Sequence, residues 1–370
     1  MSERTEIAWC DSTFNPWIGC TKVGPGCDNC YAEREFDHRH HKAKWGPGQE
    51  RVRTSAHNWR QPIRWNAKPF AECPACGHRG EPNMVSGLSP EGQMMVCPQC
   101  HNGPMKPARR RVFSGSLCDV FDNEVPAQWR ADLFRLIADT PNLDWLILTK
   151  RIGNASRMIA EATAHVELED DSVGEWASSK PWPNVWLGAT ICNQTEADRD
   201  IPKLLAVPAA VRFVSMEPLL GSVTLREVHS DVCEIDALTG DHGVLRPLRG
   251  RSDAKVHWVI VGGESGPKAR PMHPDWVRSL RDQCQAAGVP FLFKQWGEWA
   301  NASCGIGWPQ ENLDCGVLRH DGLLVNPATE AVVRGEYRGE PRAHVIRVGK
   351  KLAGRLLDGK IHNEFPEGRP

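Results

Sequence analysis

Apolar runs alternate with amphipathic segments through the middle of the chain. Short runs rich in aliphatic and aromatic residues predict strands at Val112–Phe113, Trp145–Leu148, Val185–Thr190, Val211–Val214, Val256–Val261 and Pro290–Phe293. Apolar residues at helical spacing predict helices over Pro126–Ala138, Asn154–His165, Glu196–Leu205 and Asp275–Ala287. Nearly continuous apolar strands separated by helices are typical of a parallel α/β sheet covered on both faces.

Polar side chains follow most of these strands. The residues at the predicted carboxyl ends are Ser114, Ser116, Thr149, Lys150, Thr190, Glu217, Glu264, Lys294 and Gln295. Parallel α/β folds, barrels and open sheets alike, place their sites at this edge. The pattern therefore predicts a functional rim, and the loop after the short apolar stretch Ile7–Trp9 would belong to it.

Four of the rim residues are candidate catalytic residues. Glu217 ends an otherwise apolar strand, where a charge is costly unless it meets a partner or a ligand. We expect Glu217 and Glu264 to contact substrate or cofactor. We expect Lys150 and Lys294 to steer an anion, although salt bridges at the rim explain the two lysines equally well.

The cofactor-binding candidates on the same rim are small residues. They are Ser114, Ser116, Gly262 and Gly263. Glycines after a strand let backbone amides approach a ligand, and a plain tight turn is an equally good reading of this pair.

The remaining segments divide the chain into four parts. Residues 1–60 would hold the first cysteine loop and the start of the sheet, 61–108 a metal-binding insert, 109–300 the main α/β body and 301–370 a C-terminal extension. The stretch 224–255 interrupts the alternation and is expected to be an excursion. Val348–Leu357 predicts a closing basic helix.

Composition narrows the classes of function. The chain has 370 residues and a formal net charge of −1, so only local basic stretches, at 34–44, 106–111 and 338–355, could attract nucleic acid, and each could equally be a solvated surface. The polar start of the chain is not a secretory signal, and no run of about eighteen apolar residues predicts a membrane span. Fourteen cysteines in such a chain indicate a reducing, cytoplasmic compartment and metal ligation.

Four cysteines have the spacing of a structural zinc site. Cys73, Cys76, Cys97 and Cys100 form a C-x2-C-x20-C-x2-C pattern, typical of a zinc ribbon or knuckle. Four thiolates complete a tetrahedron, so this zinc would be structural. The residues between the pairs are rich in Gly, Pro and Ser, and metal binding would supply their folding energy.

Three further cysteines have a different pattern. Cys20, Cys27 and Cys30 are spaced C-x6-C-x2-C with no fourth cysteine nearby. A [4Fe–4S] cluster normally takes four thiolates, so three would leave one iron open for a small molecule such as S-adenosylmethionine (SAM). The alternative is a zinc site completed by His38, His40 or His41, and a disulfide is the weaker reading.

The residues around these three cysteines resemble a known family. Gly19-Cys20-Thr21-Lys22, Gly26-Cys27 and Cys30-Tyr31-Ala32-Glu33 are similar to the signature of a bacteriophage and prophage three-Cys-motif family regarded as radical-SAM-like. Later similar blocks are Leu148-Thr149-Lys150-Arg151, Ser215-Met216-Glu217-Pro218, Val261-Gly262-Gly263-Glu264 and Phe293-Lys294-Gln295-Trp296. The more familiar radical-SAM spacing is C-x3-C-x2-C with an aromatic before the last cysteine, whereas here Tyr31 follows it.

The resemblance implies a fold and an activity. The fold would be a parallel-sheet partial (β/α) barrel of the radical-SAM type, with the zinc insert and the C-terminal extension added to it. The enzyme would use a [4Fe–4S] cluster and SAM, with an electron donor such as flavodoxin or ferredoxin. Its substrate would be DNA or a modified thymidine nucleotide in the cytoplasm of a phage-infected host.

Three functions remain open from the sequence. The first is an isomerase that moves an amino-acid adduct of glycinyl type on thymidine from nitrogen to carbon linkage, during DNA hypermodification that evades host restriction. A base within DNA would have to be flipped out to reach such a site. The second is a lyase that repairs a thymine photoproduct. The third is a non-enzymatic zinc protein that binds nucleic acid.

Overall fold

The computed structural model describes residues 3–86, 93–101, 104–164, 181–230, 233–241, 254–301, 314–325 and 342–366. The chain forms two compact units. The first unit consists of residues 1–21, 32–148 and 154–186, and the second of residues 22–31, 149–153 and 187–370.

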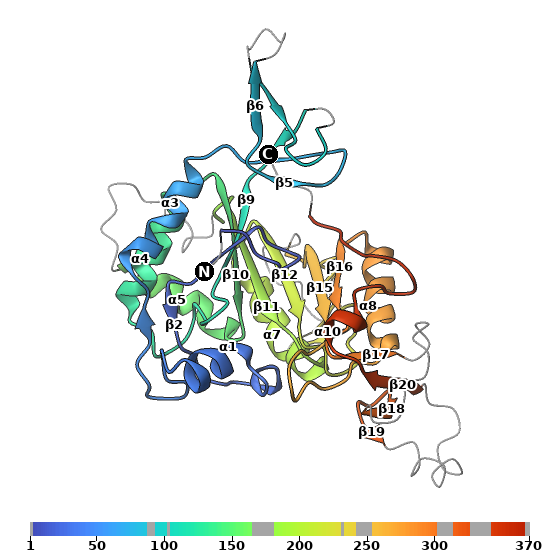
Figure 1. Cartoon of the computed structure of the whole chain (residues 1–370). Coiled ribbons are helices and arrows are strands. Elements are labelled where there is room, and N and C mark those ends of the chain that lie inside the picture. The colour runs from blue at the N-terminus through green and yellow to red at the C-terminus, as the bar shows by residue number, and fades with distance from the viewer. Residues whose placement is uncertain are drawn as a thin grey trace, which may run out of the picture. The chain divides into compact units, whose positions relative to one another are not determined.

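The central element is a seven-stranded sheet (Figure 1). Its strands, in hydrogen-bonded order, are β1 (Ser12–Phe14), β9 (Arg110–Ser114), β10 (Leu143–Thr149), β11 (Val185–Thr190), β12 (Val211–Met216), β15 (Trp258–Gly262) and β16 (Phe291–Gln295). The pairs β1–β9, β9–β10, β12–β15 and β15–β16 are parallel. Every residue of β11, β12 and β15 is buried. The predicted parallel α/β sheet is therefore confirmed.

The first unit contains short helices and one long one. Its elements outside the sheet and the insert are β2 (Trp17–Ile18), a π-helical turn (Arg34–Arg39), β3 (Val52–Arg53), α2 (Ala56–Trp59), α3 (Gln61–Asn66) and α4 (Ala127–Ala138). The short helix α1 (Tyr31–Glu33) and α5 (Ile152–Ala164) each contain residues of both units. Helix α4 buries Leu133, Phe134 and Ile137, and the indole of Trp145 on β10 donates a hydrogen bond of 3.0 Å to Thr140 just after α4.

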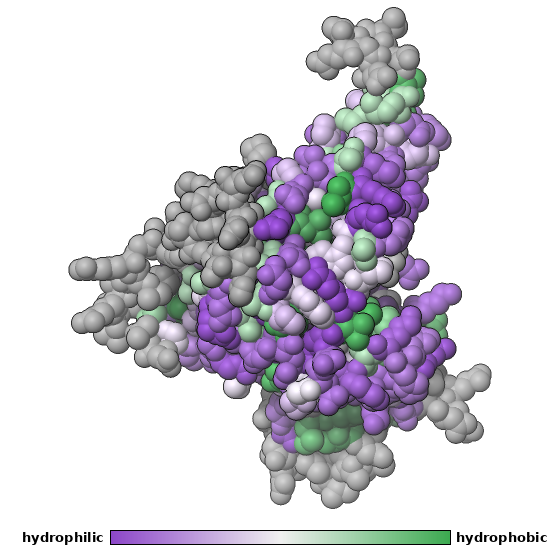
Figure 2. Space-filling model, turned by 90° about the vertical axis from the view of Figure 1, so that its left-hand side faces the viewer, coloured by the Kyte–Doolittle hydropathy of each residue, from purple (hydrophilic) through white to green (hydrophobic). Residues whose placement is uncertain are grey.

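The predicted metal-binding insert is a set of short antiparallel strands in the first unit. One small sheet has the order β5 (Arg79–Gly80), β4 (Ala71–Glu72), β8 (Lys106–Pro107), and a separate ladder joins β6 (Asn83–Ser86) to β7 (Gln93–Val96). Met84, Val85 and Met94 on this ladder are exposed. Figure 2 shows hydrophobic residues at the surface there, near the top of the view.

The second unit adds helices and two smaller sheets. A 3-10 turn (Pro25–Cys27), α7 (Gln194–Ala206) and α8 (Pro274–Ala287) are its main helical segments, and α8 packs against β16 (Figure 1). The predicted excursion contains the ladder of β13 (Val228–His229) and β14 (Glu234–Ile235), and residues 242–253 of it lie outside the described residues.

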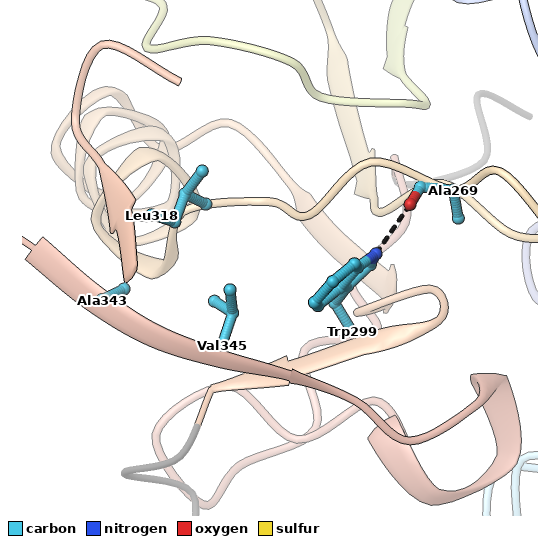
Figure 3. Close-up of a cluster of buried hydrophobic side chains, with 5 residues drawn as sticks. All are labelled: Ala269, Trp299, Leu318, Ala343 and Val345. Carbon is cyan, nitrogen blue, oxygen red and sulfur yellow. Dashed lines mark hydrogen bonds between the residues drawn. The ribbon is translucent and has the colours of Figure 1, made fainter. Parts of the chain in front are cut away.

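The C-terminal extension contains a four-stranded sheet. Its order is β17 (Trp299–Asn301), β20 (Arg342–Arg347), β18 (Cys315–Arg319) and β19 (Leu324–Val325). A buried apolar cluster lies against it, in which Trp299 points toward Ala269 (Figure 3). Its other members are Leu318, Ala343 and Val345. This small sheet is therefore packed against the loop that follows β15.

The two ends of the chain contain features that the sequence did not predict. The first strand is Ser12–Phe14, which follows the apolar stretch Ile7–Trp9, and its Ser12 and Thr13 are buried where they pair with β9. The predicted closing helix is reduced to α10 (Lys350–Ala353). Gly349 and Gly354, on either side of it, have φ of +85° and +69°, which an α-helix does not admit.

Among the helices of the described residues, none is long and apolar enough to cross a membrane.

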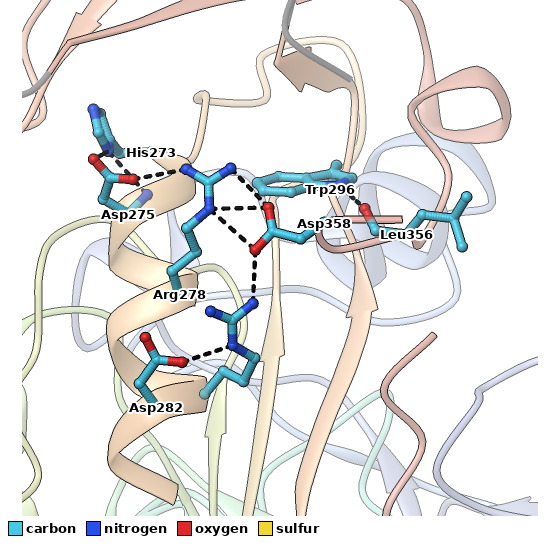
Figure 4. A network of polar contacts seen from close by, with 8 residues as sticks. His273, Asp275, Arg278, Asp282, Trp296, Leu356 and Asp358 are labelled. Carbon is cyan, nitrogen blue, oxygen red and sulfur yellow. Dashed lines mark hydrogen bonds and ion pairs between the residues drawn. The ribbon is translucent and has the colours of Figure 1, made fainter. Parts of the chain in front are cut away.

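A network of charges ties the C-terminal segment to α8 (Figure 4). Arg278 donates to the carboxylate of Asp358 at 2.8 Å and to that of Asp275 at 2.8 Å. Arg281 also donates to Asp358, at 2.6 Å. The indole of Trp296 donates to the carbonyl of Leu356 at 2.9 Å. The segment after α10 is thereby held against the second unit.

This network predicts a pH dependence of stability. Hydrogen bonds from Arg278, and to a lesser degree from Arg281, lower the pKa of Asp358 from 3.8 to about 2. Because the folded pKa lies below the unfolded one, the stabilisation is present above about pH 4 and is lost as pH falls toward 2. We expect Asp358→Asn to lower the free energy of unfolding at pH 7 by about 1 kcal/mol, a value discounted for the 38% exposure of the side chain.

Urea unfolding of wild type and variant between pH 7 and pH 2.5 measures this effect. The difference should narrow below about pH 4. Asn tolerates the φ of +50° at this position, so the variant removes mainly the charge. Asp282→Asn is the matched control, since Asp282 is 61% exposed and pairs with Arg281 at 2.8 Å. A difference independent of pH would contradict the assignment.

Candidate metal and cofactor sites

The four cysteines of the insert come together as predicted. Their sulfur atoms all lie within 4.8 Å of one another, and within the described residues this is the one group of three or more His, Cys, Asp or Glu side chains so arranged. Cys73 Sγ is 3.6 Å from Cys100 Sγ, and Cys76 Sγ is 3.7 Å from Cys97 Sγ. Four thiols at these separations can hold a metal ion as zinc or within an iron–sulfur site.

Two knuckle turns place these sulfurs. The amide of Gly77 donates to the carbonyl of Cys73 at 2.9 Å, and the amide of His101 donates to that of Cys97 at 3.1 Å. Gly77 has a φ of +71°, a conformation that glycine adopts without strain. Each Cys-x-x-Cys pair is therefore folded back on itself by its own local turn.

The thiols of the group do not titrate alike. Desolvation opposes ionisation of Cys97, but the amides of Cys100 and Gln99 donate hydrogen bonds to it, and its pKa falls to about 7. The amide of His78 favours the Cys76 thiolate, but desolvation and the other three cysteines outweigh it and raise the pKa of Cys76 to about 12. Since metals bind thiolates, binding would release protons from this group.

Arg79 anchors the insert to the sheet. Its guanidinium contacts the carboxylate of Asp11 at 3.1 Å, donates to the carbonyl of Arg109 at 2.8 Å and pairs with Glu72. Asp11 in turn accepts a hydrogen bond of 2.8 Å from the amide of Arg111, the second residue of β9. The insert is thus joined to β9 by charged hydrogen bonds.

The basic stretch 106–111 contains an exposed lysine and arginines that form ion pairs. Arg110 is 4% exposed and lies 3.5 Å from Glu81 and 3.7 Å from Glu3. Arg109 lies 3.8 Å from Asp144. The sequence did not predict these ion pairs, and attraction of nucleic acid to this stretch stays a prediction.

Cys20 belongs to the first unit. The amide of Gly46 donates to its carbonyl at 3.0 Å. Next to it, Arg51 donates to Thr21 Oγ1 at 2.7 Å and to Asp122 at 2.8 Å, the latter a fully buried ion pair. The predicted cofactor residue Ser116 accepts a hydrogen bond of 2.8 Å from the amide side chain of Asn15 in the same unit.

Cys27 and Cys30 belong to the second unit, on the segment that begins with the 3-10 turn. Gly26, between Pro25 and Cys27, is tightly packed within this unit. A Cβ added there would lie 2.5 Å from Cys192 Sγ and 3.4 Å from Lys150 Cε. Because Cys20 and these two cysteines lie in different units, convergence of all three sulfurs stays a prediction.

Glu264 is almost fully occupied by protein donors. One carboxylate oxygen accepts from the Arg270 amide at 2.8 Å, Arg270 Nε at 2.8 Å and Asn29 Nδ2 at 3.0 Å, and the other from Arg270 Nη2 at 2.6 Å. Burial raises the pKa of Glu264, but these hydrogen bonds, chiefly from Arg270, outweigh it and leave the pKa below its ordinary value. Glu264 is thus a carboxylate held by the chain itself, and direct contact with a substrate stays a prediction.

Glu217 and Lys294 form the other predicted charged pair. Lys294 Nζ donates to Glu217 Oε2 at 2.9 Å, so the salt-bridge reading of this lysine is correct, and its role toward an anion stays a prediction. The second carboxylate oxygen, Oε1, is buried and has no hydrogen-bond partner among the described residues. The same is true of Thr190 Oγ1 on β11 of the same unit. Both atoms can accept a hydrogen bond from a ligand.

Gly262 and Gly263 each have a steric reason to be glycine. A Cβ at Gly262 would lie 2.7 Å from Glu217 Oε1, and one at Gly263 would lie 1.9 Å from the carbonyl oxygen of Trp296. Gly263 donates its amide to the carbonyl of Gln295 at 2.9 Å. Gly263 therefore permits the close approach of Trp296 after β16, and Gly262 that of the Glu217 side chain, and a role of the pair toward a cofactor stays a prediction. In the first unit, the Ser114 hydroxyl is buried without a partner among the described residues.

Sequence reasoning did not identify Arg270 or Asn29. Arg270 and Asn29 are 241 residues apart and meet only at Glu264, so no local pattern could reveal them. The Asp28-Asn29 pair between two of the cysteines was the one available signal.

Comparison with known proteins places the chain in a family without assigning a function. No curated protein and no solved structure matches it. Over residues 4–366 the chain matches the model of DUF5131, described as a protein of unknown function. That description names neither a cofactor nor a reaction. The chain therefore belongs to the DUF5131 family.

Proposed function

We propose that this protein is a radical SAM enzyme that acts on a modified thymidine of phage DNA and isomerises an amino-acid adduct of the base. The observation that carries the proposal is the C-x6-C-x2-C pattern of Cys20, Cys27 and Cys30. Three thiols suit a [4Fe–4S] cluster with one open iron. We propose in addition that the four-cysteine group of the insert holds a structural zinc.

The second unit has groups that fit a cofactor or substrate bearing an amino or hydroxyl donor. Glu217 Oε1 is a buried acceptor that receives no hydrogen bond from the described residues, and Thr190 Oγ1 is a second. A buried unpaired carboxylate oxygen is costly, so a donor from a ligand would be stabilised there. Lys294 balances the charge of Glu217 at 2.9 Å.

The chain's own residues would bind and orient. Cys20, Cys27 and Cys30 would hold the cluster, which when bound supplies the electron that cleaves SAM to methionine and a hydrogen-abstracting 5′-deoxyadenosyl radical. Glu217 would accept a hydrogen bond from the ligand, and Lys150 would face its anionic part. Such chemistry needs donor and acceptor in near-attack geometry with water excluded.

Iron content tests the cofactor. Protein reconstituted with iron and sulfide under anaerobic conditions should bind about four irons per chain and absorb broadly near about 400 nm. Replacing Cys20, Cys27 and Cys30 together with alanine should abolish this iron and leave the metal of the insert in place. The Cys73→Ser, Cys76→Ser variant is the matched control and should keep the iron. Zinc alone in protein purified under argon would overturn the radical assignment and favour a zinc-dependent nucleic-acid-binding protein.

Product analysis tests the reaction. Reduced enzyme with SAM should release 5′-deoxyadenosine, and mass spectrometry of nucleosides from phage-type DNA bearing an amino-acid adduct should reveal an isomer of unchanged mass and new fragmentation. Restored thymine from irradiated DNA would instead identify a repair lyase. No cleavage of SAM with any nucleic acid or nucleotide would contradict the proposal.

A further inference from the structure

We propose that Arg270 and Glu264 are positioning residues that clamp the loop of Cys27 and Cys30, and that the C-terminal four-stranded sheet braces this clamp. The use of the clamp, to present two cysteines to a metal cluster, rests on the proposed function. The contacts that form it do not. All the residues involved belong to the second unit.

Arg270 reaches the cysteine loop at two points. Its Nη2 donates to the carbonyl of Pro25 at 2.8 Å, and its Nη1 donates to the carboxylate of Asp28 at 3.0 Å. The same guanidinium is held by Glu264 through Nε and Nη2. One planar side chain therefore links a nearly buried carboxylate to both sides of Cys27, a geometry that a fork of fixed donors provides and an ammonium does not.

Asn29 closes the clamp from the side of the loop. Its amide nitrogen donates to Glu264 Oε2 at 3.0 Å and to the carbonyl of Lys268 at 2.9 Å. The three residues Pro25, Asp28 and Asn29 thus surround Cys27, and the last of them precedes Cys30 directly. Neither cysteine side chain is used in any of these contacts.

The loop between Glu264 and Arg270 is itself held by the C-terminal sheet. The indole of Trp299 donates to the carbonyl of Ala269 at 2.7 Å, within the apolar cluster of Figure 3. Glu298 accepts from the amide of Gly266 at 2.9 Å, and its own amide donates to the carbonyl of Glu264 at 3.0 Å. Arg347 on β20 donates to the carbonyl of Gly266 at 3.0 Å.

These contacts suggest a role for the C-terminal extension, which is to hold the cysteine loop in place. The cysteine loop has only one 3-10 turn of regular structure, and ordering such a loop costs conformational entropy at each residue. Contacts that fix it before a metal arrives reduce that cost at the moment of binding, as outer groups do for metal ligands in general. The extension therefore acts on Cys27 and Cys30 through Ala269 and Arg270.

Thiol alkylation of the metal-free protein tests the clamp directly. Cys27 is 8% exposed, so a maleimide reaches it only when the loop opens. Mapped by mass spectrometry, Arg270→Met should raise the alkylation rates of Cys27 and Cys30 by about tenfold, since it removes charged hydrogen bonds at both ends of Cys27. Exposed Cys315 is the internal reference and should react at an unchanged rate.

Three further variants keep the test decisive. Arg226→Met is the matched control, because Arg226 is 54% exposed and pairs with Asp236 away from the loop. Arg270→Lys should lie between wild type and Arg270→Met. Trp299→Phe, which removes only the donor to Ala269, should raise the Cys27 rate by about twofold to threefold. Unchanged Cys27 rates in folded Arg270→Met would overturn the clamp.

Iron retention separates the clamp from the proposed function. If wild type binds iron, Arg270→Met should lose it to a chelator about tenfold faster. If wild type binds no iron, the proposed function fails while the alkylation rates still decide the clamp. If wild type binds iron and Arg270→Met changes neither alkylation nor retention, the clamp is wrong and the function stands.

Discussion

Gly263→Ala is expected to destabilise the second unit by about 3 kcal/mol, the largest effect of any single substitution proposed for this sheet. A Cβ at this position would lie 1.9 Å from the carbonyl oxygen of Trp296 and 2.5 Å from its carbonyl carbon. Both are backbone atoms, so no rotamer change relieves the clash and the strands β15 and β16 must separate locally. Urea unfolding monitored by tryptophan fluorescence measures the loss.

Gly153→Ala is the matched control for this prediction. A Cβ there would meet Lys203 Cδ at 3.5 Å, an ordinary contact with the stem of a flexible side chain. Gly153 lies in α5, where alanine is favoured over glycine by about 0.5–1 kcal/mol, so the control should be neutral or stabilising. If Gly263→Ala were as stable as Gly153→Ala, the close approach of the Gly263 and Trp296 backbones would be incorrect.

The strands of the sheet could be predicted because buried strands have a recognisable apolar composition. A strand covered on both faces, such as Val185–Thr190, contains only apolar or small residues, and its bounds agree with the structure. The β1 strand could not be placed in the same way. Ser12 and Thr13 are polar and yet buried, and nothing local distinguishes them from a loop.

The candidate sites differ in the same way: one depends on residues close together in the sequence and the other on residues far apart. The four cysteines of the insert lie on two turns of four residues each, so their spacing alone predicts that they meet. The clamp on Cys27 depends instead on Glu264 and Arg270, more than 230 residues further along the chain. The sequence presents Glu264 as a rim carboxylate and carries no sign of the arginine that occupies it.

Glycines illustrate a second limit of sequence reasoning. Gly262-Gly263 after a strand has the appearance of a ligand-binding turn, whereas the structure supplies a reason in the approach of Glu217 and Trp296. Gly349 and Gly354 flank α10 and limit the helix predicted over Val348–Leu357 to four residues. In each case the reason for the glycine is a close contact or a positive φ value that depends on the tertiary fold.

Removal of the metal from the insert is expected to unfold that segment and leave the two units otherwise intact. The apolar cluster of the insert contains few side chains: Ala71, Cys73, Cys97 and Met105, with Met95 and Cys100 packed against it. Two of the four buried members are metal-ligand candidates, so little hydrophobic burial remains without them. Structural zinc contributes about 10–16 kcal/mol of binding free energy in small metal-folded domains, which is far more than this cluster can replace.

Limited proteolysis measures this outcome. Cys73→Ser, Cys76→Ser protein, or wild type treated with a strong chelator, should be cleaved rapidly within residues 71–107 by a protease of broad specificity, while fragments covering β9 to β16 stay resistant. Cys315→Ser is the matched control, because Cys315 is exposed and lies outside the group. Arg79 lies between the two cysteine pairs and would still be held by Asp11 and Arg109, so cleavage should begin between Arg79 and the second cysteine pair. Retention of metal and of protease resistance in the double variant would show that the four sulfurs meet without binding an ion.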